Sequence, residues 1–327
     1  MVTVNKPTYI FFAGIYDYWK IANEDLYHNP DVFVCEGIKN SLLNKLNRIH
    51  NARRFNREKE LPFKTIWFHL YNCASFLDKG KKQYIVFPEN NQLSFSGQYL
   101  SYLRSTYPKL VMLFEFTNVC GKYNNLARLS RVRHLYDHII TFNEADSRRY
   151  GFRFQSLCYS YCEPEASDFP YADLLFIGKN KGRLPLLISI YDRLAGLGLK
   201  CRFFVTDISP EQQVSRPGIT YEQYMPYRDV LKHVGNAGCI LDILEDNNAY
   251  FSLRTYEALM YRKKLITANP EVLMLPIYSP DQMLYIKSPE DITKEFFETP
   301  VTNKYDVTAF SPNSKLREYA KLERTKP

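Results

Sequence analysis

The chain has 327 residues, of which 45% are hydrophobic and 24% charged, a composition ordinary for globular proteins and sufficient for two apolar cores. No stretch approaches the roughly 18 consecutive apolar residues of a membrane-spanning helix, and residues 1–10 lack the charged-then-apolar pattern of a secretory signal. The seven cysteines are odd in number and scattered, which argues against a disulfide framework and predicts a cytoplasmic protein.

Positive charge is concentrated in the first half of the sequence. Residues 1–165 carry 22 Lys and Arg against 15 Asp and Glu, a net charge of +7, whereas the remainder carries 21 against 20, a net charge of +1. Either the first half faces an anionic partner, such as a membrane surface, or it has a solvated basic face. Nucleic acid is not expected as the partner, because no nucleic-acid-binding motif is present.

The basic residues of this half cluster between residues 39 and 64, where they alternate with apolar ones. The cations are Lys39, Lys45, Arg48, Arg53, Arg54, Arg57, Lys59 and Lys64, and the apolar residues are Leu42, Leu43, Leu46, Ile49 and Phe55. One interpretation is an amphipathic helix that contacts anionic lipid headgroups at the inner face of the cell membrane. The other is a charged helix that covers its own domain.

In chain order, short apolar runs alternate with longer amphipathic stretches, the pattern of parallel sheets covered by helices. The first half is predicted to contain helices at 37–57 and 97–107 and strands at 9–13, 65–70, 84–87, 110–116, 138–142 and 155–159. Residues 160–170 are acidic, contain two prolines and show no period, so they are predicted to link two domains.

The alternation then resumes, with predicted helices at 184–197, 228–234 and 252–261, strands at 173–177, 201–205, 239–244, 264–267 and 284–286, and a helical tail at 289–298 and 313–324. The predicted fold is α/β, with two Rossmann-like, doubly wound domains (1–165 and 166–327) that face each other across a cleft. Ligands of such sheets bind beyond the carboxyl ends of the strands.

The most informative local pattern is the predicted helix that follows Ser252. Ser252 suits an N-cap, and the first turn combines free backbone N–H groups with the cation of Arg254, which favours a bound phosphate or diphosphate. Glu257 follows three residues later on the same face, where its carboxylate could accept hydrogen bonds from two sugar hydroxyls. The alternative is an ordinary capped helix with an Arg–Glu surface pair.

Residues 252–259 (SLRTYEAL) and 263–269 (KKLITAN) resemble the donor-binding helix and following strand of bacterial GT-B glycosyltransferases, especially those of capsule and lipopolysaccharide assembly. The resemblance extends over roughly residues 173–288. It implies that Glu257 binds the ribose of a nucleotide sugar. It also implies that Ser252, Leu253 and Arg254 approach the diphosphate of a UDP- or GDP-linked donor, and that no further cofactor is needed.

A second pattern lies at the predicted turn between strand 173–177 and the next helix. Two glycines and three cations occur there: Gly178, Lys179, Lys181, Gly182 and Arg183. Such a turn can present backbone N–H groups and positive charge to phosphate. The spacing is not that of a Walker loop. In the family that the chain resembles, this turn faces the phosphates of the nucleotide.

One departure from the family concerns stereochemistry. Retaining members often carry a glutamate eight positions before the ribose-binding one, and here that position is Ala249, with Glu245 and Asp246 nearby. An inverting displacement is therefore favoured, which needs a general base. Asp17, after the first strand, and Glu115, near the end of the apolar strand 110–116, are the candidates, and His69 is a third.

No His, Cys or Asp pattern with metal-ligand spacing is present, so metal-independent catalysis is predicted. Together these features predict transfer of a hexosyl unit from a nucleotide-sugar donor to a saccharide or lipid-linked acceptor. Two alternatives stay open: a nucleotide-sugar epimerase or hydrolase of the same fold, and a noncatalytic sugar-binding or membrane-associated assembly subunit.

Overall fold

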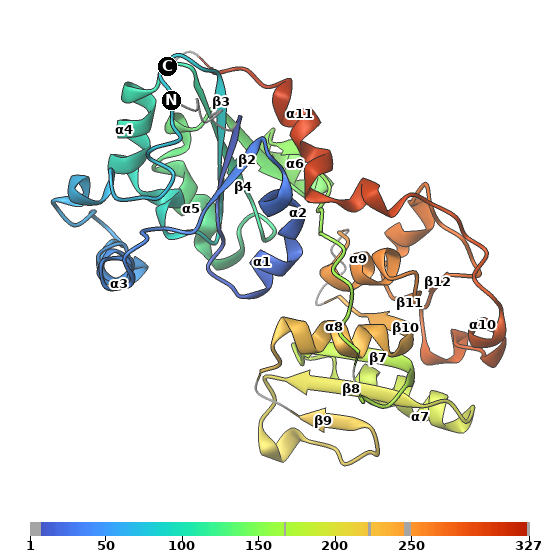
Figure 1. Ribbon diagram of the computed structural model, residues 1–327. Helices are drawn as coiled ribbons and strands as arrows, with labels where there is room; N and C mark the ends of the chain where they lie inside the picture. The colour runs from blue at the N-terminus through green and yellow to red at the C-terminus, as the bar shows by residue number, and fades with distance from the viewer. Residues whose placement is uncertain (1–7, 167, 222–223, 245–249, 326–327) are drawn as a thin grey trace. The chain divides into compact units, whose positions relative to one another are not determined.

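The computed structural model describes residues 8–166, 168–221, 224–244 and 250–325 (Figure 1). The chain divides into two compact units. Unit 1 contains the described residues up to Ser160 together with those from Ser311 onward, and unit 2 is Tyr161–Phe310. Within the described ranges, no helix has both the length and the apolar character needed to cross a membrane.

Unit 1 is built on a six-stranded sheet in which every strand pair is parallel. The strand order is β2-β1-β3-β4-β5-β6, with β1 at Tyr9–Phe12, β2 at Val32–Cys35, β3 at Gln83–Pro88, β4 at Leu110–Glu115, β5 at His138–Thr141 and β6 at Arg153–Phe154. The helices are α1 (Tyr18–Ala22), α2 (Glu24–His28), α3 (Ser41–His50), α4 (Gly97–Thr106), α5 (Asn125–Ser130), α6 (Glu144–Tyr150) and α11 (Leu316–Ala320). The strands are apolar on both faces, as expected for a parallel sheet that helices cover on both sides.

Alternate residues of the central strands supply two cores. Ile10 and Phe12 belong to the core that includes Leu100 and Leu103 of α4. Phe11, on the opposite face of the sheet, belongs to the core that includes Tyr319 of α11. The tail from Ser311 onward thus belongs to unit 1, because Leu316, Tyr319 and Leu322 bury their side chains there. The predicted domains, 1–165 and 166–327, differ from the observed units in the placement of this tail.

Unit 2 also has a six-stranded parallel sheet, in the order β12-β11-β10-β7-β8-β9. Its strands are β7 (Ala172–Lys179), β8 (Cys201–Thr206), β9 (Ile219–Tyr221), β10 (Ala237–Asp242), β11 (Lys264–Thr267) and β12 (Met283–Tyr285), and its helices are α7 (Leu184–Gly196), α8 (Tyr227–Gly235), α9 (Leu253–Met260) and α10 (Lys294–Glu298). Counted from β7, this is the 3-2-1-4-5-6 strand order of Rossmann domains.

Two predicted strands are wrong. The predicted strand at 65–70 is instead occupied in part by the 3-10 turn Lys64–Trp67, which follows Phe63 with its φ of +61°. The prediction failed because a short apolar run alone does not distinguish a strand from a helix. Residues 155–159 lie outside β6, whose two residues are exposed. Three short strands, β2, β6 and β9, were not predicted, and the predicted helix 37–57 contracts to α3.

Candidate functional site

The carboxyl edge of the unit 2 sheet brings together the patterns predicted to bind phosphate. Strands β7 and β10 are neighbours, and the order of the strands reverses between them. In sheets of this topology the ligand crevice lies at that reversal. Gly178 and Lys179 end β7, Lys181 and Arg183 form the turn into α7, and Asp242 ends β10.

The turn after β7 is tight. Lys181 has a φ of +46° and Gly182 a φ of +78°, both in the left-handed region. The Asn180 side chain accepts a hydrogen bond from the amide of Leu184, the first residue of α7, at 3.0 Å. The Lys179 ammonium lies 2.7 Å from a carboxylate oxygen of Asp207, but both side chains are more than half exposed. Such a pair contributes little to stability, so it does not fix the lysine in place.

Arg183 links the turn after β7 to the loop after β10. Its guanidinium donates to the backbone carbonyls of Lys179 and Ile243, and its Nε donates to the Asn180 carbonyl at 3.2 Å. The guanidinium carbon also lies 5.3 Å from the centroid of the Phe176 ring. In this arrangement Arg183 holds the two loops together, and its contact with a phosphate stays a prediction.

The start of α9 is attached to the end of β10 through a buried carboxylate. Ser252 caps α9, since its Oγ accepts a hydrogen bond from the Arg254 amide at 3.0 Å. The hydroxyls of Ser252 and Thr255 both donate hydrogen bonds to the same carboxylate oxygen of Asp242, each at 2.7 Å. Burial raises the pKa of Asp242, while these two hydroxyls and the charge of Arg254 oppose the shift. Sequence reasoning missed Asp242 and Thr255, although an acid at a strand end followed by a helix-capping serine was a usable signal.

Glu257 is fully buried in the second turn of α9. One carboxylate oxygen accepts a 3.0 Å hydrogen bond from the Tyr227 hydroxyl of α8, and the other pairs with the Arg254 guanidinium. Burial raises the pKa of Glu257, against the opposing effects of Arg254 and Tyr227. The Arg–Glu pair expected from the spacing is therefore formed, and a ribose contact at Glu257 stays a prediction.

Of the other residues singled out around α9, the structure describes Leu253 but not those at 245–249. Leu253 is the first residue of α9 and is half-buried. Ala249, Glu245 and Asp246, on which the expectation of an inverting reaction rested, lie outside the described residues. The stereochemical outcome therefore stays a prediction.

The two carboxylates predicted as general bases in unit 1 lie in different environments. Asp17 is exposed next to the start of α1, and its side chain does not cap that helix. Glu115 ends β4 and accepts hydrogen bonds from Lys315 at 2.6 Å and from the Tyr319 hydroxyl at 3.3 Å. Because Lys315 is itself buried, this ion pair fastens the C-terminal tail to the sheet. A base role for either carboxylate stays a prediction.

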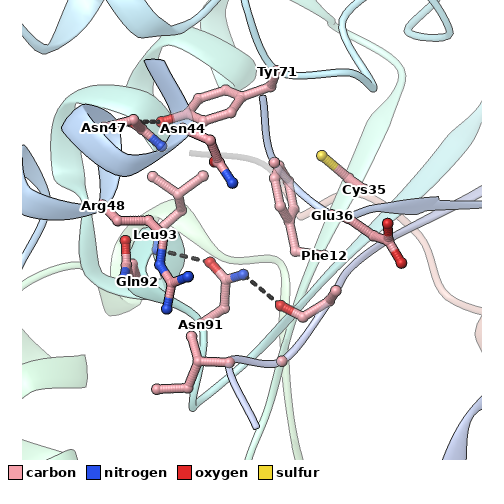
Figure 2. Close-up of a pocket in the computed structure, with 14 residues that line it drawn as sticks. Phe12, Cys35, Glu36, Asn44, Asn47, Arg48, Tyr71, Asn91, Gln92 and Leu93 are labelled. Carbon is pink, nitrogen blue, oxygen red and sulfur yellow. Dashed lines mark hydrogen bonds between the residues drawn. The ribbon is translucent and has the colours of Figure 1, made fainter. Parts of the chain in front are cut away.

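Unit 1 has a pocket of about 150 Å3 at the carboxyl ends of β1, β2 and β3 (Figure 2). Amide side chains dominate its polar lining, which comprises Asn44, Asn47, Asn91, Gln92, Glu36 and Arg48. Asn91 donates to the Ala13 carbonyl at 2.7 Å, and Asn47 accepts from the Tyr71 hydroxyl at 3.1 Å. Sequence reasoning missed the pocket because β2 was not predicted, so Glu36 was not identified as a residue that follows a strand.

Gly14 lines the same pocket, near the start of the loop that follows β1. A Cβ atom at this position would lie 2.5 Å from the Trp19 ring and 2.8 Å from the side-chain oxygen of Asn90. The close approach that requires a glycine here is therefore to the protein's own side chains. Asn90 is partly buried, and among the described residues neither of its buried side-chain polar atoms has a hydrogen-bond partner.

In the part of the chain that the structure describes, no three His, Cys, Asp or Glu side chains are grouped so that they could hold a metal ion. The Nε2 of His138 lies 2.7 Å from the backbone carbonyl oxygen of Glu323. Metal-independent catalysis stays a prediction.

Searches with the sequence found neither a matching protein-family model nor a matching curated protein. Solved structures do match along the whole chain. Staphylococcus aureus MnaA bound to UDP matches with a TM-score of 0.52 and 10% identity, over 98% of this chain and 99% of that one. Anabaena HepE in complex with UDP and glucose matches with a TM-score of 0.51 and 11% identity, over 97% of this chain and 100% of HepE. A Listeria monocytogenes protein assigned as a UDP-N-acetylglucosamine 2-epimerase matches with a TM-score of 0.50 and 10% identity, over 98% of both chains.

These likenesses establish a shared fold. The predicted α/β fold with two Rossmann-like sheets is confirmed, and it is the fold of GT-B type.

Proposed function

We propose that the chain binds a nucleoside-diphosphate sugar at the carboxyl edge of the unit 2 sheet and acts on the sugar. The observation that carries this proposal is the grouping of Arg183, Arg254 and Glu257 with the N-terminus of α9 at the reversal of a Rossmann-order sheet. The complexes of MnaA with UDP and of HepE with UDP and glucose support it, since both proteins share the fold.

The diphosphate would lie between the turn after β7 and the start of α9. Lys179, Lys181 and Arg254 supply positive charge there, and the helix N-terminus adds its partial positive charge. Gly178 would let the backbone approach the ligand from one side, although a Cβ atom at this position would already lie 3.1 Å from Phe176 and 3.4 Å from Arg183. Ser252 and Leu253 would present the first turn of α9 to the phosphates.

In this proposal, the binding of the ribose and the binding of the diphosphate are coupled, because Glu257 and Arg254 would each exchange the other for a group of the ligand. A ribose hydroxyl would replace the Arg254 guanidinium at Glu257, and the released guanidinium would pair with the diphosphate. The two side chains are three residues apart on α9, and Arg254 is the more exposed of the pair, so it is the group that can move. The Tyr227 hydroxyl would keep Glu257 in place during the exchange.

Conversion of the donor without an acceptor, by an epimerase or hydrolase, is the first candidate for the reaction. The likeness to the Listeria protein supports it, because the match extends over nearly the full length of both chains. Asp17 or Glu115 would serve as the base, and Glu115 would first have to leave Lys315.

Transfer to a saccharide or lipid-linked acceptor, as in surface polysaccharide synthesis, is the second candidate. The unit 1 pocket is the observation in its favour, since amide and carboxylate side chains are suited to hydrogen-bonding the hydroxyls of a sugar. An inverting, metal-independent mechanism is proposed for this transfer.

Calorimetry with UDP, GDP and CMP tests the binding step directly, and we expect one of the three to bind. The matching nucleotide sugars are then incubated with the protein without an acceptor and followed by NMR. A new epimer or free sugar identifies the first candidate. Turnover that requires an added saccharide or lipid-linked acceptor identifies the second. Absence of binding by all three nucleotides overturns the proposal.

A further inference from the structure

Helix α3 of unit 1 turns three of its apolar side chains away from the protein, while Leu43 packs against the core. Leu42, Leu46 and Ile49 follow one another at helical spacing, and their exposed fractions are 65%, 45% and 43%. The opposite side of the helix carries amides. Asn47 is buried and accepts hydrogen bonds from Tyr71 at 3.1 Å and from Asn51 at 2.7 Å. An ordinary surface helix has the reverse orientation, so the outward apolar stripe requires an explanation.

The segment that follows α3 also exposes apolar side chains. Phe63 is 76% exposed, and Phe55, Ile66 and Leu70 also have exposed side chains. Hydrogen bonds fasten the segment to the end of α3. The Lys64 ammonium donates to Asn51 at 2.9 Å, and the Trp67 ring donates to His50 at 2.6 Å. Figure 1 shows α3 and this segment projecting at the edge of unit 1, away from the sheet. We call the seven apolar residues Leu42, Leu46, Ile49, Phe55, Phe63, Ile66 and Leu70 the α3 surface.

The exposed charges around the α3 surface are mostly positive. The exposed cations between residues 39 and 70 are Lys39, Lys45, Arg48, Arg53, Arg54, Arg57 and Lys59, whereas Glu58 is the one acid of this stretch in the exposed class. Glu60 is partly buried and its carboxylate accepts from the amides of Gly97 and Gln98. An excess of cations around an apolar stripe is the combination that amphipathic helices use at anionic lipid interfaces.

We propose that the α3 surface docks on an anionic lipid bilayer, with its aliphatic and aromatic side chains in the interfacial layer and the surrounding cations on lipid phosphates. Two other occupants fit less well. A second copy of the chain, placed by two-fold symmetry, would bring the same cations against each other. A nucleic acid would leave the aliphatic side chains of α3 without a partner. The same helix lends Asn44 and Arg48 to the unit 1 pocket, so docking would hold that pocket within about one helix diameter of the lipid surface.

Cosedimentation of the full chain with vesicles tests the proposal without any nucleotide, so its result is independent of the proposed function. We expect binding to vesicles of 70% phosphatidylcholine and 30% phosphatidylglycerol, and at least tenfold weaker binding to pure phosphatidylcholine. The double variant Leu42→Ser/Leu46→Ser should weaken binding to the anionic vesicles at least tenfold. Arg53→Glu/Arg54→Glu should do the same, and added salt should weaken binding of the unaltered chain.

Two matched controls come from unit 2, where Met274 is 78% exposed and Lys304 is also exposed. Met274→Ser and Lys304→Glu should bind like the unaltered chain. Circular dichroism verifies that each variant is folded, as expected for substitutions of exposed side chains. The proposal is overturned if the unaltered chain does not bind anionic vesicles, or if the α3 variants bind as well as the controls. It is also overturned if Leu42→Ser/Leu46→Ser dissociates a dimer that has no affinity for vesicles.

Discussion

The two units have the same kind of sheet but differ in how the carboxyl edge of that sheet is filled. In unit 2 the charged side chains at the edge are paired within the protein: Arg183 with backbone carbonyls, Asp242 with Ser252 and Thr255, and Glu257 with Arg254 and Tyr227. In unit 1 the edge holds an open pocket lined by amides, while the strand-end carboxylate Glu115 is used to hold the tail.

This difference has a physical consequence. Buried charges at the edge of unit 2 are stable only while each has a partner, so a ligand must exchange partners with them. The amides of unit 1 carry no net charge and can accept or donate hydrogen bonds to a neutral ligand at a smaller cost. Unit 2 thereby presents paired charges at its edge, whereas unit 1 presents mainly neutral amides, with the charges of Glu36 and Arg48 beside them.

The largest effect is expected from the ion pair of unit 1. Glu115→Ala leaves Lys315 buried without its carboxylate, which should lower the free energy of unfolding by about 3–5 kcal/mol. Both tryptophans, Trp19 and Trp67, belong to unit 1, so urea unfolding followed by tryptophan fluorescence reports on this unit alone.

The double variant Glu115→Leu/Lys315→Met is the control for this experiment. It removes both charges together and should recover most of the lost stability. A single variant as stable as the unaltered chain would contradict the role assigned to this pair.

A smaller effect, on binding, is expected at Glu257. Glu257→Gln keeps the shape of the side chain and its bond to Tyr227 but removes the charge that pairs with Arg254 and would receive the ribose. Nucleotide affinity should fall by about 1.5–3 kcal/mol, the usual cost of losing a hydrogen bond to a charged group. Calorimetry measures the nucleotide affinity of this variant. The matched control is Glu36→Gln in the unit 1 pocket, which should leave nucleotide affinity unchanged. Equal affinity of the two variants would remove Glu257 from the site.

How far the sequence predicts this molecule depends on whether the signal is local. The strand and helix at 239–267 are predicted closely because their hydrophobic periods and the Ser252 cap are contained in a few residues. The return of the tail to unit 1 depends on Lys315 meeting Glu115, 200 positions away, which no local pattern contains. Strand β2 was missed because it has only four residues, two of them half-buried.

The candidate site in unit 2 was likewise predicted only where the signal is local. Spacing predicted that Arg254 and Glu257 share a helical face, and they do. Spacing could not predict that Tyr227 of α8 completes the environment of Glu257, because a contact between two helices depends on tertiary packing. The α3 helix was predicted only as two alternatives, one at a lipid surface and one covering its own domain, for a related reason: the sequence gives the amphipathic period of a helix but not which face is turned to the core.

A pH profile distinguishes the buried carboxylates of unit 2 from the ordinary acids of the surface. Burial raises the pKa of Asp242 above 3.8, so between that value and the raised one the folded state binds more protons than the unfolded state. Stability from this group therefore increases as the pH falls, by at most about 1.4 kcal/mol per pH unit. The difference in stability between the unaltered chain and Asp242→Asn, followed by circular dichroism from pH 7 to pH 4.5, should change in that direction. A difference that is constant with pH, or that changes in the opposite direction, would contradict the assignment.

The smallest effect is expected at Lys179, whose partner Asp207 is equally exposed. Lys179→Ala should leave the unfolding transition unchanged, because an exposed ion pair contributes almost nothing after solvent screening. Its contribution to a bound diphosphate is a long-range, screened attraction, so nucleotide affinity should fall by less than about fivefold and the loss should disappear at high salt. Lys304→Ala, which removes an exposed cation of unit 2 outside the proposed site, is the control. Equal effects of the two variants would mean that net charge alone attracts the nucleotide, whereas a loss of affinity confined to Lys179→Ala supports a diphosphate site at the turn after β7.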